Sequence, residues 1–132
     1  MARFYKYFLL LTSSILLLAS CQEGSEAGQL LGQWRMTNTN NHYVAFSGSV
    51  AVMRTTDDNG FLQQEVFGNF QREGDSLFIQ CYSINEDIAD VVMVEEELGF
   101  KPFNNIRVKI ETLSGDILVL SKDGQKWNFH KY

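Results

Sequence analysis

The chain has 132 residues, and its 11 lysines and arginines against 16 aspartates and glutamates give a formal net charge of −5. This acidic balance excludes the electrostatic footprint that proteins need to bind nucleic acid or anionic lipid headgroups through their surface. A hydrophobic content of 45% with a single proline excludes a disordered chain, and the length allows one domain with a modest core.

The first 20 residues have the organisation of a secretory signal peptide. Arg3 and Lys6 supply positive charge, and residues 8–18 form an apolar run that is too short for a spanning helix of about 20 apolar residues. Small residues, Ala19 and Ser20, follow this run, as they do at signal-peptide cleavage sites.

The sequence Leu18-Ala19-Ser20-Cys21 resembles the lipobox of bacterial lipoproteins. The resemblance implies that Cys21 is diacylated, becomes the first residue after cleavage, and is acylated again on its new amino terminus. Several acyl chains hold a protein at a bilayer almost permanently, since each buried methylene contributes about 0.8 kcal/mol. An ordinary signal peptide that ends beside a cysteine is the alternative.

Residues 21–28 combine the lipidated cysteine with a polar, glycine-containing stretch, which predicts a flexible tether. Gln22 and the early acid Glu23 resemble the export signal of Bacteroidota lipoproteins. The resemblance implies a lipid-anchored protein of the cell envelope, in the outer membrane. It leaves open whether the protein lies on the inner face of that membrane or is exposed at the cell surface.

Between residues 29 and 132, turn signals separate apolar runs that alternate with polar residues, the pattern of an all-β domain. The alternation is clearest at Ile106, Val108 and Ile110. Asp123-Gly124 is a typical hairpin turn, because glycine tolerates the positive φ of a type I′ turn. Strands are predicted at residues 33–39, 43–56 with a bend at 47–49, 61–71, 76–83, 104–112, 117–121 and 127–132.

Residues 85–99 interrupt this pattern. Asn85 is a candidate helix cap, and Ile88, Val91, Val92 and Leu98 recur at helical spacing on one face. Three glutamates at 95–97 oppose a helix, because they would lie at the negative end of its dipole, and a strand is the alternative. We favour one short helical insertion.

The predicted fold is therefore a small antiparallel up-and-down barrel of about seven to eight strands, because closure removes exposed sheet edges. An open β-sandwich is the alternative.

The sequence Leu31-Gly32-Gln33-Trp34 resembles the first conserved region of lipocalins, and the ending of the chain is similar to small lipocalin-like lipoproteins of Bacteroidota. The resemblance implies that Gly32 turns the chain inward and that Trp34 closes the base of the barrel. Lipocalins pack an arginine from the last strand on this tryptophan. Here His130 or Lys131 would take that place, through a cation–π contact.

No catalytic arrangement is apparent, and we expect a protein that is not an enzyme and has no metal or cofactor beyond the lipid on Cys21. His42 lies in a polar run and is interpreted as a solvated turn residue, and the acidic residues between 86 and 97 as a solvated face. Cys81 is expected to be a buried thiol. The aromatic residues proposed to line an apolar ligand pocket are Tyr43, Phe46, Phe70, Phe78 and Tyr82.

The sequence thus favours a membrane-anchored, lipocalin-like module that binds a small apolar ligand or a partner protein at the cell envelope. The alternative is a structural or accessory subunit of an envelope complex, with a packed barrel and no ligand.

Replacing Cys21 by alanine is expected to release the protein from membranes, because the acyl chains have no other attachment site. Fractionation of cells that express either chain, with immunodetection in the membrane pellet, measures this. A Cys21→Ala chain that still sediments with membranes would contradict the lipid anchor.

Overall fold

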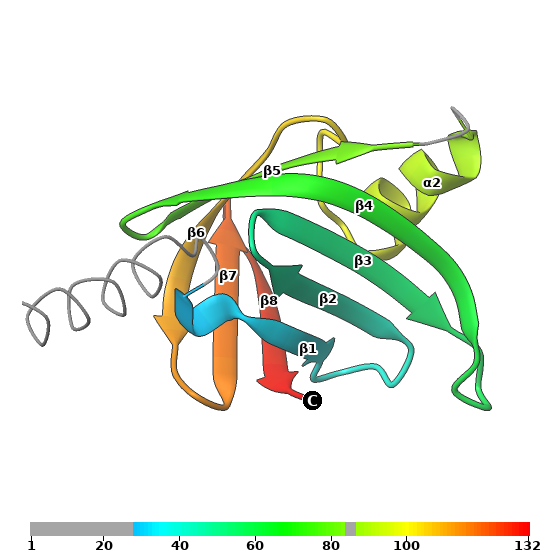
Figure 1. The fold of residues 1–132 in the computed structure, drawn as a ribbon, viewed down its shortest axis with the longest axis horizontal. Helices are drawn as coiled ribbons and strands as arrows, with labels where there is room; N and C mark the ends of the chain where they lie inside the picture. The colour runs from blue at the N-terminus through cyan, green and yellow to red at the C-terminus, as the bar shows by residue number, and fades with distance from the viewer. Residues whose placement is uncertain (1–27, 84–86) are drawn as a thin grey trace, which may run out of the picture.

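Within residues 28–83 and 87–132, which this computed structural model describes, eight antiparallel strands close into a barrel, each bonded to its neighbours in sequence and the last to the first (Figure 1). This confirms the predicted up-and-down barrel, and the open β-sandwich is wrong. The strands are β1 (Gly32–Met36), β2 (His42–Ser47), β3 (Val50–Thr56), β4 (Leu62–Glu73), β5 (Ser76–Tyr82), β6 (Ile106–Leu113), β7 (Ile117–Lys122) and β8 (Gln125–Lys131).

Alternation along each strand sends one set of side chains into the barrel and the other set outward. In β6, Ile106, Val108 and Ile110 are buried, whereas Arg107 and Lys109 are exposed, which confirms the prediction for this strand. No helix in the described residues is both long enough and apolar enough to cross a membrane.

The single strand predicted at residues 43–56 is wrong, because the chain forms two strands there. Ser47 of β2 pairs with Val50 of β3, so that Gly48 and Ser49 make a tight hairpin turn instead of a bend. The turn at Asp123-Gly124 is confirmed, since both residues have positive φ, at 50° and 86°.

The helical insertion is confirmed, but of the face predicted from Ile88, Val91, Val92 and Leu98 only Leu98 is buried. Helix α2 (Ile88–Val92) buries none of its side chains, and the π-helical turn η2 (Met93–Glu97) buries Met93 and Val94. The wider turn, in which Leu98 N donates to Met93 O, breaks the 3.6-residue spacing on which the prediction depended. Asp87 caps α2, and Asn85 lies outside the described residues.

A short 3₁₀ turn, η1 (Gly28–Leu30), covers the base of the barrel, the end where β1 begins and β8 ends. Trp34 is fully buried there, and its Nε1 donates to Leu30 O at 2.9 Å. Lys131 Nζ lies 4.5 Å from the centre of the Trp34 ring and donates to Leu31 O.

Gly32 leaves the room that Lys131 needs. Its φ is +119°, and a Cβ atom at this position would lie 2.6 Å from Lys131 Nζ. The glycine is therefore required both by the backbone conformation and by the lysine side chain that crosses it.

Trp34→Ala is expected to lower the free energy of unfolding by about 3–5 kcal/mol, because it leaves a cavity at the base and an unpaired Leu30 carbonyl. Urea denaturation measures this. Phe61→Ala is the matched control, since this aromatic side chain is 69% exposed and its loss should change stability by no more than about 0.5 kcal/mol. Equal effects of the two substitutions would show that Trp34 does not seal the base.

Cys81 is expected to resist thiol reagents while the protein is folded. The side chain is buried on the inner face of β5, and this burial raises the pKa of the thiol to about 12, so that almost no thiolate exists at pH 8. In a Cys21→Ala chain, which leaves one thiol, modification by an aromatic disulfide should become rapid only in denaturant.

Because the folded thiol binds its proton more tightly than the unfolded thiol, with its ordinary pKa of 9.0, stability should fall as pH rises from about 9 to 12. Modification of the folded chain at the rate of a free cysteine would contradict the buried assignment.

Candidate functional site

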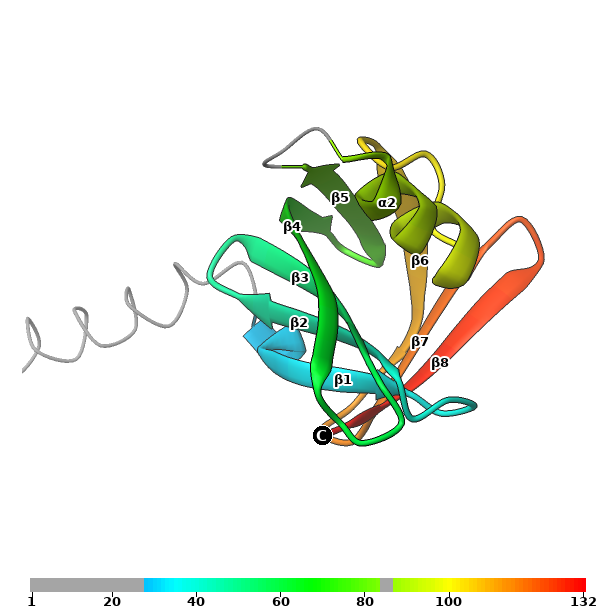
Figure 2. The ribbon, with the colours of Figure 1, turned by 90° about the vertical axis from the view of Figure 1, so that its right-hand side faces the viewer.

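The mouth of the barrel, at the end opposite η1, is covered by α2 and η2 (Figure 2). Figures 1 and 2 both place α2 beside the end of β5, far from the turn that precedes β1. The β1–β2 loop, the β3–β4 loop and the β7–β8 turn also lie at this end, as the antiparallel order of the strands requires.

The segment after η2 closes the mouth by packing on Trp127. The indole Nε1 of Trp127 donates to Leu98 O at 2.8 Å, and the Phe100 ring stacks on the indole with the ring centres 4.7 Å apart. Gly99 between them has a φ of +85°, and a Cβ atom there would lie 2.9 Å from Gln125 Nε2. The close approach of this segment to β8 therefore depends on a residue without a side chain.

The acidic residues of this segment do not form the single solvated face that was predicted. Asp90 accepts hydrogen bonds from Gln64 Nε2 at 2.9 Å and from Ser83 Oγ at 2.6 Å, and Glu95 accepts one from the backbone N of Phe103 at 2.8 Å. These carboxylates join the segment to β4, to Ser83 directly after β5, and to the loop that follows η2.

A cleft of about 520 Å³ opens at the mouth between the β1–β2 loop, η2 and β8. Its apolar lining comes from Met36, Leu98 and Trp127. Its polar lining comes from Thr37, Asn38, Thr39, His42, Glu96, Glu97, Gln125, Lys126 and Asn128.

His42 lies in this cleft, half-buried, as the first residue of β2, so its interpretation as a solvated turn residue is wrong. Sequence reasoning did not find the cleft. The only sequence signal for the cleft was the polar run at residues 37–41 between two predicted strands. Such a run indicates a loop, but it does not indicate which other segments of the chain lie next to that loop.

The five aromatic residues proposed for a ligand pocket do not lie together. Phe46 and Phe70 meet inside the barrel, edge to face, with ring centres 5.0 Å apart. Tyr43, Phe78 and Tyr82 have the opposite parity on their strands and lie on the outer face, where Tyr43 packs on Tyr132 and Tyr82 is 45% exposed. The five therefore do not share one pocket, because two of them fill the core and three face outward. Only Phe70 and Phe78 line a common hollow, on the outer side of the barrel.

Of the two residues proposed to replace the lipocalin arginine, Lys131 lies over Trp34 and His130 does not. His130 instead faces Arg35 on the neighbouring strand, with Nε2 at 2.9 Å from Arg35 Nη2 and 3.2 Å from Arg35 Nε. The parity of β8 explains this, since adjacent residues of a strand point to opposite faces.

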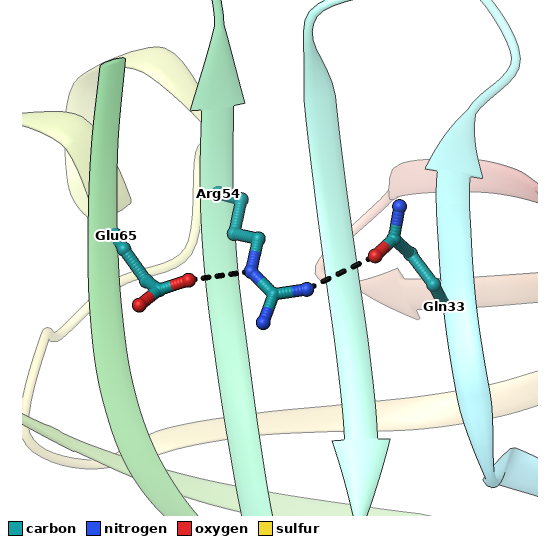
Figure 3. Close-up of polar contacts among 3 residues, drawn as sticks. All are labelled: Gln33, Arg54 and Glu65. Atoms are coloured by element: carbon teal, nitrogen blue, oxygen red, sulfur yellow. Dashed lines mark hydrogen bonds and ion pairs between the residues drawn. The ribbon is translucent and has the colours of Figure 1, made fainter. Parts of the chain in front are cut away.

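A polar row on the outer face of the barrel is structural. Arg54 of β3 donates from Nε to Glu65 Oε2 of β4 at 2.6 Å, and its Nη1 reaches across β2 to Gln33 Oε1 of β1 at 3.0 Å (Figure 3). Both charged side chains are about one-third or less exposed, and such a pair contributes modestly, on the order of 1 kcal/mol or less. Because these groups bond to one another, we do not treat the row as a binding site.

Within residues 28–83 and 87–132, no group of three or more His, Cys, Asp or Glu side chains is arranged to hold a metal ion.

Comparison with known proteins gives one family and two similar structures. A family model for a lipocalin-like domain matches residues 16–132. A lipocalin-like protein from Bacteroides uniformis ATCC 8492 is 23% identical, with a TM-score of 0.66 over 80% of this chain and 100% of that chain. An uncharacterized protein from Bacteroides eggerthii DSM 20697 is 17% identical, with a TM-score of 0.64 over 77% of this chain and 98% of that chain.

No curated protein is similar enough to match the chain. At these identities the two structures share the fold, whereas the family model covers the barrel from η1 to the last residue of the chain. The protein belongs to the family of lipocalin-like domains.

Proposed function

We propose that this protein is a non-enzymatic, lipid-anchored binding module of the cell envelope, which holds a small amphipathic molecule at the mouth of its barrel. The observation that carries the proposal is the mouth cleft, in which an apolar floor meets a polar rim. Its volume of about 520 Å³ falls within the range of about 300–1,000 Å³ that small-molecule sites occupy. Membership of a family built on a binding fold supports the same role.

The lining of the cleft indicates the chemistry of the ligand. Met36 and Leu98 offer apolar contact at the floor, and the exposed rim carries Glu96, Glu97 and Lys126, two carboxylates against one ammonium group. Glu96 is also paired with Lys101 at 3.6 Å, so the net negative charge of the rim is small. An apolar body with a neutral polar head fits this mixed rim, in which side chains of both signs and several amides surround the apolar floor.

The proposed lipid on Cys21 would keep the base of the barrel near the membrane. Residues 22–27 separate this cysteine from η1, and six residues span no more than about 22 Å when fully extended. Since η1 covers the base, the base would face the membrane and the mouth would point away from it. The cleft would then be open to molecules in the surrounding envelope compartment.

A second function is favoured by the packing of the barrel. Met93, Val94 and Phe100 fill the mouth, and Leu30 and Trp34 fill the base, all of them at most 1% exposed. A barrel closed in this way also suits an accessory subunit that contacts an envelope protein and binds no small molecule.

Native mass spectrometry of the full chain purified from its source distinguishes these functions. We expect a mass that exceeds the lipidated protein by that of one small molecule. Thr37→Trp, which introduces a bulky side chain at the cleft, should abolish the additional mass. Asn59→Trp, at a polar position in the β3–β4 loop that is also exposed but lies outside the cleft, should retain it.

An additional mass that survives Thr37→Trp would place the ligand elsewhere and contradict the proposed site. A wild-type protein without any additional mass, recovered in stoichiometric complex with another envelope protein, would favour the accessory function instead.

A further inference from the structure

A second hollow lies on the outer flank of the barrel, on β4, β5 and β6 and apart from the mouth cleft. The register places Gln71, Phe78 and Arg107 in one row across the three strands. Asn69 and Gln80 form the next row, and Asn105, which precedes β6, lies in the same hollow. The hollow measures about 550 Å³ and is lined by Ser49, Asn69, Phe70, Gln71, Phe78, Gln80, Asn105 and Arg107.

The lining is polar and carries no carboxylate, although the chain as a whole has 16 acidic residues and a net charge of −5. Four of the eight lining residues are amides. Asn69, Gln71 and Gln80 are exposed, and in the described part of the chain their side chains make no hydrogen bond. Three pairs of amide donors and acceptors are therefore available to a ligand.

Of the two aromatic residues that line the hollow, Phe70 is buried, so Phe78 presents the accessible ring among these amides. Phe78 is half-buried, and the guanidinium carbon of Arg107 lies 5.7 Å from the centre of its ring. Arg107 Nε also approaches Asn105 Oδ1 at 3.4 Å. The guanidinium is thus held beside the ring and adds further donors to the hollow.

We infer that this hollow binds a saccharide. Sugar hydroxyls both donate and accept hydrogen bonds, as side-chain amides do, and the C–H face of a sugar ring offers apolar contact for Phe78. A cation would find no carboxylate there, and an apolar ligand would have to desolvate the amides without replacing their hydrogen bonds. One arginine on an acidic chain does not provide a surface for nucleic acid.

The face continues beyond the hollow, which indicates an oligosaccharide. Phe67 and Tyr82 pair across β4 and β5 in the row next to Asn69 and Gln80, and Tyr82 is 45% exposed. Tyr82 and Phe78 lie four residues apart on the same face of β5, a separation of about 13 Å. An extended chain of sugars could contact both rings and the amides between them.

Titration of the full chain with maltotriose, cellotriose and triacetylchitotriose, followed by NMR of the side-chain amides, tests the inference. With at least one of these sugars we expect saturable shifts of the Asn69, Gln80 and Asn105 resonances. Gln80→Ala should weaken binding by at least about tenfold. Gln63→Ala removes an exposed amide from β4 outside the hollow and should leave affinity unchanged.

Phe78→Ala should likewise weaken binding. Because Phe78 is half-buried, its loss could also disturb folding, whereas Gln80 is exposed and its substitution tests binding without that effect. The inference is overturned if none of the three sugars shifts these resonances at about 20 mM, a concentration that nearly saturates a site with a Kd of about 1 mM. It is equally overturned if the shifts appear only at mouth residues such as Gln125. Neither result bears on the amphipathic ligand proposed for the mouth, so the two proposals fail separately.

Discussion

An indole N–H bonded to a leucine carbonyl closes each end of this barrel. Trp34 reaches Leu30 in the turn that covers the base, and Trp127 reaches Leu98 in the segment that covers the mouth. Both indoles are almost completely buried, so an unpaired group at either position would cost about 1–3 kcal/mol. A segment that crosses the end of a barrel leaves the strand ladder and must find other partners for its carbonyls. The two tryptophans supply those partners, and thereby fix where each covering segment lies.

This closure decides where ligands can bind. The side chains that cover the two ends meet those of the strands in one continuous buried cluster, in which Phe46 and Phe70 lie edge to face. Small barrels are commonly filled in this way. Recognition therefore falls to the surface: to the cleft beside η2, where the covering segment meets β8 incompletely, and to the outer flank, where alternation exposes every second residue of β4, β5 and β6.

The strands and the base were predictable from the sequence because their signals are local. Alternation and turn residues predicted most strands, and the Gly32 and Trp34 pattern indicated the base. The face of the sheet on which an aromatic residue lies was harder to predict, because the residue type does not indicate whether the side chain points into the barrel or outward. Tyr43 and Phe46 were grouped by type although they point to opposite faces. The mouth was missed since it joins residues near positions 37, 97 and 127, whose proximity only the closed topology creates. The lipid on Cys21 stays a prediction, because it lies outside the described residues.

The position of the flank relative to the base bears on how the two proposed sites operate together. Ser49, in the turn between β2 and β3 at the base end, borders the flank hollow, whereas the mouth cleft lies at the other end of the strands. If a lipid at Cys21 holds the base near a bilayer, the flank faces sideways close to the membrane surface, and the mouth faces away from it. A saccharide bound on the flank would therefore not obstruct the mouth. Because the two sites have no lining residue in common and lie at different places on the closed barrel, we expect them to act independently.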